Sequence, residues 1–396
     1  MRNQNPVFIP GPTNIPDVIR KACDMATLDH RSAAFAQIFA PAVSGVKQVL
    51  GTARGEVILF PSTGTGGWEA AITNTLSPGD TVLAARFGMF SHRWIDMCQR
   101  HGLKVEIIET PWGQGAPLPQ IEAALRADAG HKIRAVLATH NETATGVKSD
   151  IAGIRRALDR AKHPALMFVD GVSSIGSMEF RMDGWGVDIA VAGSQKGFML
   201  PAGLAILGVS EKALAAMETA TLPRTFFDFR DMRNSYLAGG YPYTPAVGLL
   251  NGLKVSCNLL LDEGIEAVWA RHHRIAEGVR RAIAGWGLAP CAASPDLYSD
   301  TVTAVVVPDG CNGTDLVKLA AEKYDMAFGV GLGEVAGKVF RIGHLGSLTD
   351  AMMLSGLAVA EMCMADLGWP VKLGSGVAAA QDYYRTHGHA AAKAAA

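Results

Sequence analysis

The stretch VDIAVAGSQKGFMLPAGLAILGV, residues 187–209, holds two short apolar runs with a small polar segment between them. Both runs are rich in apolar and branched residues and are bounded by glycine and proline, which predicts two buried strands. The segment that joins them is short, so the two strands can pair in antiparallel fashion. One lysine, Lys196, follows the first strand directly. The fold around this ammonium group decides whether its role is structural or chemical.

Five further β-rich runs precede this stretch, and helical segments separate most of them. They lie at residues 56–60, 81–85, 104–109, 133–140 and 165–170. In one intervening segment, Ile151, Ile154 and Leu158 fall on the same helical face. Alternating strands and helices indicate βαβ units, and therefore a mostly parallel sheet covered by helices on both faces. Together with the two strands above, the runs predict a seven-stranded sheet in an α/β fold.

The remainder of the chain predicts a second, smaller unit. A long helical stretch occupies residues 247–284, and a shorter α/β region follows it. We predict an N-terminal segment of residues 1–20, a large domain of residues 21–280 and a small C-terminal α/β domain of residues 281–396.

Composition limits the kinds of partner. The 396 residues are 49% hydrophobic and 18% charged, and the formal net charge is -1, so we expect a globular protein that binds neither nucleic acid nor membrane. The six cysteines form no C-x-x-C pair and no cluster with histidine, so no metal site is expected. The first residues show no apolar leader. A cytoplasmic location is the expectation.

In open α/β sheets, ligands lie beyond the carboxyl ends of the strands. The first strand is followed by FPSTGTGGWEA, in which Thr63, Gly64 and Thr65 precede a helix. Glycines let backbone N–H groups approach an anion, and the helix N-terminus adds its positive dipole end, so this loop predicts a phosphate cradle. The loop is neither a Walker A motif nor G-x-G-x-x-G. Taken alone, it could equally be a glycine-rich turn with a Ser/Thr cap.

Two more strand ends carry unusual chemistry. Asp170 closes a buried run, where a carboxylate is costly unless it is paired, although a lone Asp could also cap a turn. Lys196 could extend its amine to water, but burial would lower the pKa of the amine and make it a nucleophile. A phosphate cradle, a buried carboxylate and an amine on neighbouring strands together are what pyridoxal 5′-phosphate requires.

The order of these blocks resembles the class V, fold-type-I aminotransferases. The resemblance runs along nearly the whole chain, through FIPGPTNIP, DHRS, GMFSHRW, YPYTP and GLGEVAGKVFRIGHLG. The serine–glyoxylate, alanine–glyoxylate and aspartate–glyoxylate group is the most similar, and the serine–glyoxylate type matches best in GTGGWE, HNETATGV and GSGVAAA.

The resemblance implies a role for each matching position. Lys196 would form the Schiff base with pyridoxal phosphate and carry the α-proton, and Asp170 would hold the pyridine nitrogen protonated. Arg341 would bind the substrate α-carboxylate through its planar fork. The other positions that match cofactor contacts are Thr63, Gly64, Thr65 and Gln195 at the phosphate, Phe90 and Val172 on the two faces of the ring, and Thr143 near the phenolic oxygen.

Two further positions imply an assembly. Tyr241 and Thr244 match residues that reach the phosphate from the other subunit, so the resemblance implies a homodimer with shared active sites. We interpret Trp68 and the neighbouring tryptophans as packing residues.

The implied reaction moves an amino group from a small L-amino acid to glyoxylate, forming glycine and a 2-oxo acid. Serine is the default donor, and aspartate and alanine stay open. Aspartate would need a cation for its side chain, and our hypothesis names Arg31, Arg93 or Arg224. A desulfurase or other lyase is less favoured because no cysteine lies in a recognisable mobile loop. A nicotinamide-dependent dehydrogenase is disfavoured because its glycine fingerprint is absent.

Overall fold

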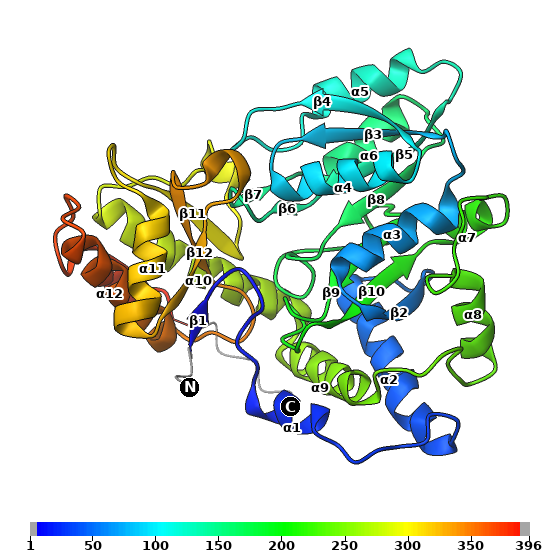
Figure 1. Cartoon of the computed structure of the whole chain (residues 1–396), viewed down its shortest axis with the longest axis horizontal. Helices are drawn as coiled ribbons and strands as arrows, with labels where there is room; N and C mark the ends of the chain where they lie inside the picture. The colour runs from blue at the N-terminus through cyan, green and yellow to red at the C-terminus, as the bar shows by residue number, and fades with distance from the viewer. Residues whose placement is uncertain (1–5, 389–396) are drawn as a thin grey trace.

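The central sheet has seven strands in the order β2-β10-β9-β8-β5-β3-β4 (Figure 1). The computed structural model describes residues 6–388. The strands are β2 (Glu56–Ser62), β3 (Thr81–Arg86), β4 (Lys104–Glu109), β5 (Ile133–Thr139), β8 (Leu166–Asp170), β9 (Ile189–Gly193) and β10 (Gly203–Val209). They coincide with the seven predicted runs. β10 is antiparallel to both β2 and β9, and the other pairs are parallel, which confirms the predicted α/β fold.

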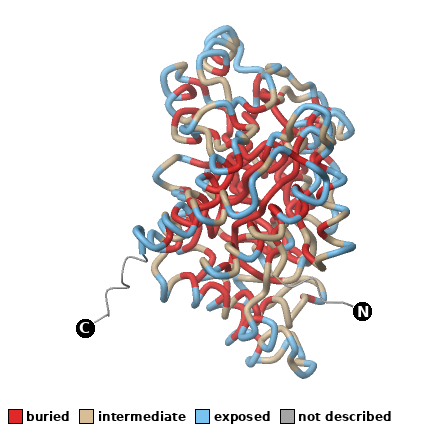
Figure 2. Tube along the Cα trace, turned by 90° about the vertical axis from the view of Figure 1, so that its left-hand side faces the viewer, coloured by how far each residue is buried: buried red, intermediate tan, exposed pale blue. Residues whose placement is uncertain are grey.

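Helices cover both faces of this sheet, as its apolar strands require. One face is covered by α2 (Ala33–Leu50), α5 (Leu118–Ala127), α6 (Ile151–Arg160) and α9 (Val247–Glu263), and the other by α3 (Gly64–Thr75), α4 (Met89–Arg100), α7 (Glu211–Met217) and α8 (Phe229–Leu237). Strand side chains alternate between these layers: Met167 and Val169 pack under the first set, and Leu166 and Phe168 under the second. Figure 2 shows the resulting buried centre.

The small domain has a four-stranded sheet in the order β1-β12-β13-β11. Its elements are β1 (Val7–Phe8), β11 (Val302–Val306), β12 (Ala327–Val330) and β13 (Val339–Gly343), with α11 (Gly313–Tyr324), α12 (Asp350–Asp366) and α13 (Ser375–Thr386). β1 pairs in parallel with β12, so the N-terminal segment is part of this sheet. Strands as short as β1 and β12 carry too little periodicity to be predicted from the sequence.

The predicted helix over residues 247–284 is two helices, α9 and α10 (Ile265–Gly285). The chain breaks at Gly264, whose φ of 87° lies in the left-handed region. In α10, Val268 belongs to the core of the large domain and Ile275 to that of the small domain, so the helix joins the two units. The predicted boundary at residue 280 falls inside α10 and stays a prediction. The outermost residues of the predicted segments, 1–5 and 389–396, lie outside the described residues.

Shorter elements complete residues 6–388: α1 (Asp17–Cys23), the hairpin of β6 (Asn141–Glu142) and β7 (Val147–Lys148), and the 3-10 turns η1 (Pro295–Leu297) and η2 (Gly333–Val335). Within the described part of the chain, α2 is long and apolar enough to cross a membrane by length and composition. Its residues Phe35, Ile38 and Val46 are buried in the core, however, so its apolar character is explained by packing.

Candidate active site

A cavity of about 140 Å³ lies at the carboxyl edge of the central sheet. Its lining residues come from the first turns of α3 and α4, the β6–β7 hairpin, the end of β8 and the loops after β8 and β9: Thr63, Gly64, Thr65, Trp68, Phe90, Thr143, Asp170, Val172, Ser173, Gln195 and Lys196. The structure therefore brings together every predicted cofactor contact except Tyr241 and Thr244. Two lining residues were not predicted for the site. Trp68 was interpreted as packing, and Ser173 was not considered.

The cradle after β2 presents free donors. Thr63 is the N-cap of α3, but its side chain makes no capping hydrogen bond. The first amide of this helix that finds an acceptor is that of Gly67, which donates to the Thr63 carbonyl at 3.1 Å. The three preceding N–H groups, at residues 64–66, have no acceptor among the described residues. Such a helix start, with its dipole, suits a phosphate.

Glycine is required at position 64 by a close approach. A Cβ atom there would lie 2.4 Å from Cγ2 of Val172, which lines the same cavity. Gln195 adds a polar group whose Oε1 is buried without a partner in the described part of the chain.

Lys196 is enclosed by the N-terminal segment. Its Nζ donates a hydrogen bond to the Pro10 carbonyl, and a Cβ atom on Gly11 would lie 2.5 Å from Nζ. Thr13 ties the segment down, because its N–H donates to the Gln195 carbonyl and its Oγ1 to the Lys196 carbonyl, each at 3.2 Å. Burial, with the nearby charge of Arg341, lowers the pKa of Lys196 to about 8. The lowered pKa leaves a much larger neutral fraction at neutral pH than an ordinary lysine has, which makes this amine a nucleophile and a proton carrier.

Asp170 ends β8 and is 4% exposed. Burial raises the pKa of its carboxyl to about 7, although the Val172 N–H donates to Oδ1 at 3.0 Å. A cationic ring nitrogen beside this group would favour its ionised form. Trp68 lies at the same wall, stacked on Trp94 with 5.6 Å between ring centroids, and its side-chain N–H favours the ionised form of Asp170 and so lowers the pKa of that carboxyl.

Arg341 reaches the site from β13 of the small domain and is 7% exposed. Its Nε donates to the Val330 carbonyl at 2.8 Å and its Nη1 to the Thr143 carbonyl at 3.0 Å. These bonds fix the plane of the guanidinium, while Nη2 has no partner in the described structure. Burial lowers the pKa of Arg341 to about 10, so it stays cationic at neutral pH and can bind a carboxylate.

These groups fit pyridoxal phosphate: the unpaired amides of α3 suit its phosphate, Asp170 its ring nitrogen and Lys196 its aldehyde. The family model "Aminotransferase class-V" matches residues 20–337. The L-aspartate–glyoxylate aminotransferase of Paracoccus denitrificans is 70% identical over the full length of both chains. The chain belongs to the class V aminotransferases. This confirms the family, enzyme class and cofactor that we predicted, because class V aminotransferases use pyridoxal 5′-phosphate.

Other aminotransferases and solved aminotransferase structures are also similar. The serine–glyoxylate aminotransferase of Hyphomicrobium methylovorum is 52% identical, with 96% of this chain and 94% of that protein covered. Among solved structures, the pyridoxamine–pyruvate aminotransferase of Mesorhizobium loti superposes with a TM-score of 0.91 at 29% identity, covering 98% of each chain. The alanine–glyoxylate aminotransferase of a Nostoc species gives a TM-score of 0.86 at 27% identity, with coverages of 92% and 96%.

Tyr241 and Thr244 lie outside the cavity of their own chain. The Tyr241 hydroxyl donates to the Leu59 carbonyl, and its ring packs edge-on against Phe39 with centroids 5.8 Å apart. Thr244 is exposed. Their predicted contact with the phosphate of a second subunit stays a prediction.

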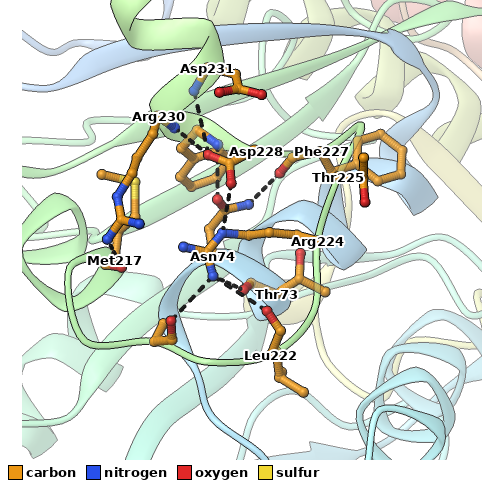
Figure 3. A network of polar contacts seen from close by, with 12 residues as sticks. Thr73, Asn74, Met217, Leu222, Arg224, Thr225, Phe227, Asp228, Arg230 and Asp231 are labelled. Carbon is orange, nitrogen blue, oxygen red and sulfur yellow. Dashed lines mark hydrogen bonds and ion pairs between the residues drawn. The ribbon is translucent and has the colours of Figure 1, made fainter.

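Arg224 is one of the three arginines considered for binding the side-chain carboxylate of aspartate, but its contacts give it a structural role (Figure 3). Its Nη1 donates to the carbonyls of Thr73, Ala220 and Leu222, at 3.1–3.4 Å, and its Nε pairs with Asp228 at 3.2 Å. The side chain is 8% exposed and does not line the cavity. Arg224 therefore fastens the segment after α7 to α3, with its Nη1 and Nε donors engaged away from the site.

The two remaining candidates are exposed. Arg93, on α4, places its guanidinium 5.5 Å from the centroid of the Phe90 ring, beside the cavity. Arg31 lies in the loop before α2. In this chain, Arg93 is the candidate that contacts a cavity residue.

The cysteines do not suit a desulfurase. None of the described cysteines lines the cavity, and burial raises the thiol pKa of Cys98 to about 12 and also raises that of Cys257. A reactive cysteine needs a lowered pKa and access to the substrate.

Proposed function

We propose that this enzyme transfers the amino group of L-aspartate to glyoxylate, forming glycine and the four-carbon 2-oxo acid. The observation that carries the proposal is the 70% identity, over the whole of both chains, with an L-aspartate–glyoxylate aminotransferase. The serine–glyoxylate relatives are less similar, at 52% and 51% identity. Of the donors that the sequence left open, aspartate therefore takes precedence over serine.

The residues of the chain divide the work. Pyridoxal phosphate, when bound, supplies the aldehyde that takes up the amino group and a ring that accepts electrons from the α-carbon. Arg341 orients the substrate by its α-carboxylate, and Asp170 stabilises a proton on the ring nitrogen. Lys196, with a pKa near 8, would move the proton between the α-carbon of the substrate and the aldehyde carbon of the cofactor, in one direction with the amino donor and in the opposite direction with glyoxylate.

The side-chain carboxylate of aspartate needs a cation. Arg93 supports this role because its guanidinium lies over the ring of Phe90, a residue of the cavity wall. We expect Arg93→Ala to lower kcat/KM for aspartate by about tenfold or more, the effect of losing a charge-assisted bond, with little change for alanine. Arg31→Ala is measured in parallel because Arg31 remains the other candidate.

Arg100→Ala is the matched control. Arg100 lies on the same helix, is exposed and pairs with Asp96 at 2.9 Å, away from the cavity. Aspartate turnover that is unchanged in both Arg31→Ala and Arg93→Ala would reject an arginine reader from this set.

The donor itself is tested in a half-reaction. The cofactor-loaded enzyme is mixed separately with aspartate, serine and alanine, and the visible absorbance of the bound cofactor is followed before glyoxylate is added. We expect aspartate to convert the cofactor fastest and glyoxylate to restore the spectrum. Faster conversion by serine would return the assignment to a serine donor.

A homodimer in the cytoplasm is part of the proposal. The exposed apolar side chains Phe226 (42%) and Leu237 (79%) lie in the segment that carries Tyr241, which supports a subunit contact there. Thr244→Ala should then weaken cofactor binding although Thr244 lies outside its own cavity. Sedimentation of a monomer with full cofactor affinity would contradict shared sites, and cell fractionation tests the compartment.

A further inference from the structure

Glu142 is a fully buried carboxylate next to the cofactor cavity. It lies in the β6–β7 hairpin and points to the N-terminus of α4. Its oxygens accept hydrogen bonds from the N–H groups of Phe90 (3.1 Å), Ser91 (3.0 Å) and Ala144 (3.2 Å), and from the Ser91 hydroxyl (3.2 Å). Gly88, the N-cap residue, has no side chain to offer, and a Cβ atom there would lie 2.2 Å from Glu142. The carboxylate therefore caps α4 from a distant part of the chain.

This cap sets the position of the stacking ring. Phe90 is in the first turn of α4, and its amide is bound by both oxygens of Glu142, at 3.1 and 3.2 Å. The ring of Phe90 lines the cavity. Movement of the carboxylate would move the backbone that carries this ring.

The next residue makes a second connection. The carbonyl of Thr143 accepts from Nη1 of Arg341 at 3.0 Å, and the Thr143 hydroxyl contacts that of Ser173 at 3.1 Å. Two adjacent residues thus hold both parts of the site: Glu142 holds the backbone that carries the Phe90 ring, and Thr143 holds Arg341.

Charge supports the same arrangement. Glu142 lies close enough to Arg341 to raise the pKa of that guanidinium, which burial lowers, and it also raises the pKa of Asp170. Two basic groups, Arg341 and Lys196, and two acidic groups, Asp170 and Glu142, thus lie close enough to influence one another's pKa values. A negative group in this wall helps to keep Arg341 charged where water is scarce.

We propose that Glu142 is a positioning residue of the transaminase: it holds Phe90 against the cofactor and, with Thr143, keeps Arg341 placed for the substrate carboxylate. The proposal rests on the transamination chemistry of the family, whichever amino acid is the donor.

The chain offers a matched control in Glu361, a second buried carboxylate that caps a helix. It is 3% exposed and accepts from the N–H groups of Gly374 (2.6 Å), Gly376 (2.7 Å) and Val377 (2.9 Å) at the start of α13, and from Trp286 Nε1 (2.8 Å). This site lies in the core of the small domain, with no contact to the cavity.

The test compares Glu142→Gln with Glu361→Gln. Both changes remove a charge and one acceptor from a helix cap, so each should lower Tm by about 2–4 °C. Only Glu142→Gln should raise KM for amino donor and glyoxylate, by about tenfold, with a smaller change in kcat. It should also weaken cofactor binding, measured by tryptophan fluorescence, and change the visible circular dichroism of the bound cofactor, which reports how its ring is packed.

Equal behaviour of the two variants would overturn the proposal, because a purely structural cap predicts stability loss alone. If Glu142→Gln does not fold, Ser91→Ala keeps the charge and removes the hydroxyl that donates to Glu142, together with the bonds of that hydroxyl to Phe87 and Gly88. It should weaken cofactor binding in the same direction by about threefold, and unchanged binding would equally reject the role. Cofactor affinity and dichroism need no substrate, so they stay decisive even if aspartate proves not to be the donor.

Discussion

Two helices begin at the same edge of the central sheet and treat their first amides differently. At α6, Asp150 accepts a hydrogen bond from the Gly153 N–H at 2.7 Å, so the helix is capped from within. At α3, Thr63 makes no such bond and the first amides open to the cavity. A cap stabilises a helix, and its absence leaves donors for a ligand. The start of α6 therefore serves to stabilise the fold, whereas the start of α3 belongs to the cofactor site.

The ionisable groups of the site follow the same contrast. Burial lowers the pKa of Lys196 to about 8 and raises that of Asp170 to about 7, so both charged forms are disfavoured in the folded protein without its cofactor. Structural residues such as Asp150 stabilise the folded state. Lys196 and Asp170 instead lower the stability of the cofactor-free protein, and they become paired when the cofactor binds.

Of the substitutions that test this difference between structural and site residues, Lys196→Met should have the largest effect. It should abolish transamination, by at least about 10³–10⁴-fold, because it removes both nucleophile and proton carrier. It should also stabilise the cofactor-free protein near pH 7 by about 1–3 kcal/mol. Between pH 8 and 10.5 the unfolded lysine binds more protons than the folded one, so wild-type stability rises with pH there, and the variant should lose this slope. Urea unfolding across that pH range measures it.

Lys212→Met is the control for that prediction. The Lys212 ammonium donates to the Ala165 carbonyl at 2.8 Å and lies 3.5 Å from Asp188, so it is a satisfied frame residue. It should give no gain in stability. A Lys196→Met protein that is less stable than wild type at pH 7 would contradict the idea that the buried ammonium of Lys196 lowers the stability of the cofactor-free protein.

Thr63→Asp converts the open helix start into a capped one. The new carboxylate can accept from the amides of the first turn and repels a phosphate, so cofactor affinity should fall by about 100-fold. The cofactor-free protein should gain about 1 kcal/mol. Equilibrium titration with cofactor and thermal melts check both effects, with Thr63→Ser as the control that keeps the hydroxyl. Unchanged affinity would mean that the phosphate lies elsewhere.

Asp150→Ala should have the smallest effect of these substitutions, and it should change the stability of the fold without changing the cofactor site. Loss of the cap should cost about 1 kcal/mol of unfolding free energy, with cofactor affinity unaltered. Asp150 also pairs with Arg156 at 2.8 Å, but both side chains are at least half exposed and the pair adds little. Chemical denaturation with and without cofactor separates the two quantities. Weakened cofactor binding in this variant would contradict the conclusion that the cap of α6 stabilises the fold without affecting the cofactor site.

Local patterns predicted most of the scaffold because strands and helices leave a periodic trace. All seven central strands were expected, and the antiparallel pairing of β9 with β10 followed from their short connection. Gly264 was missed as a helix break, since one glycine in an apolar periodic stretch is also compatible with a continuous helix. The pairing of β1 with β12 joins segments more than 300 residues apart, which periodicity cannot register.

The sequence by itself determined the α/β sheet and the polar residues at its strand ends, and through motif resemblance it predicted Lys196 as the reacting amine and Asp170 as the partner of the ring nitrogen. Only the tertiary structure decided that Glu142 caps the helix of Phe90, 52 residues away, and that Thr143 holds Arg341 across 198 residues. Strand and helix patterns arise from neighbours along the chain, whereas these contacts arise from packing between elements. A buried polar group shows its partners only when the fold has brought them together.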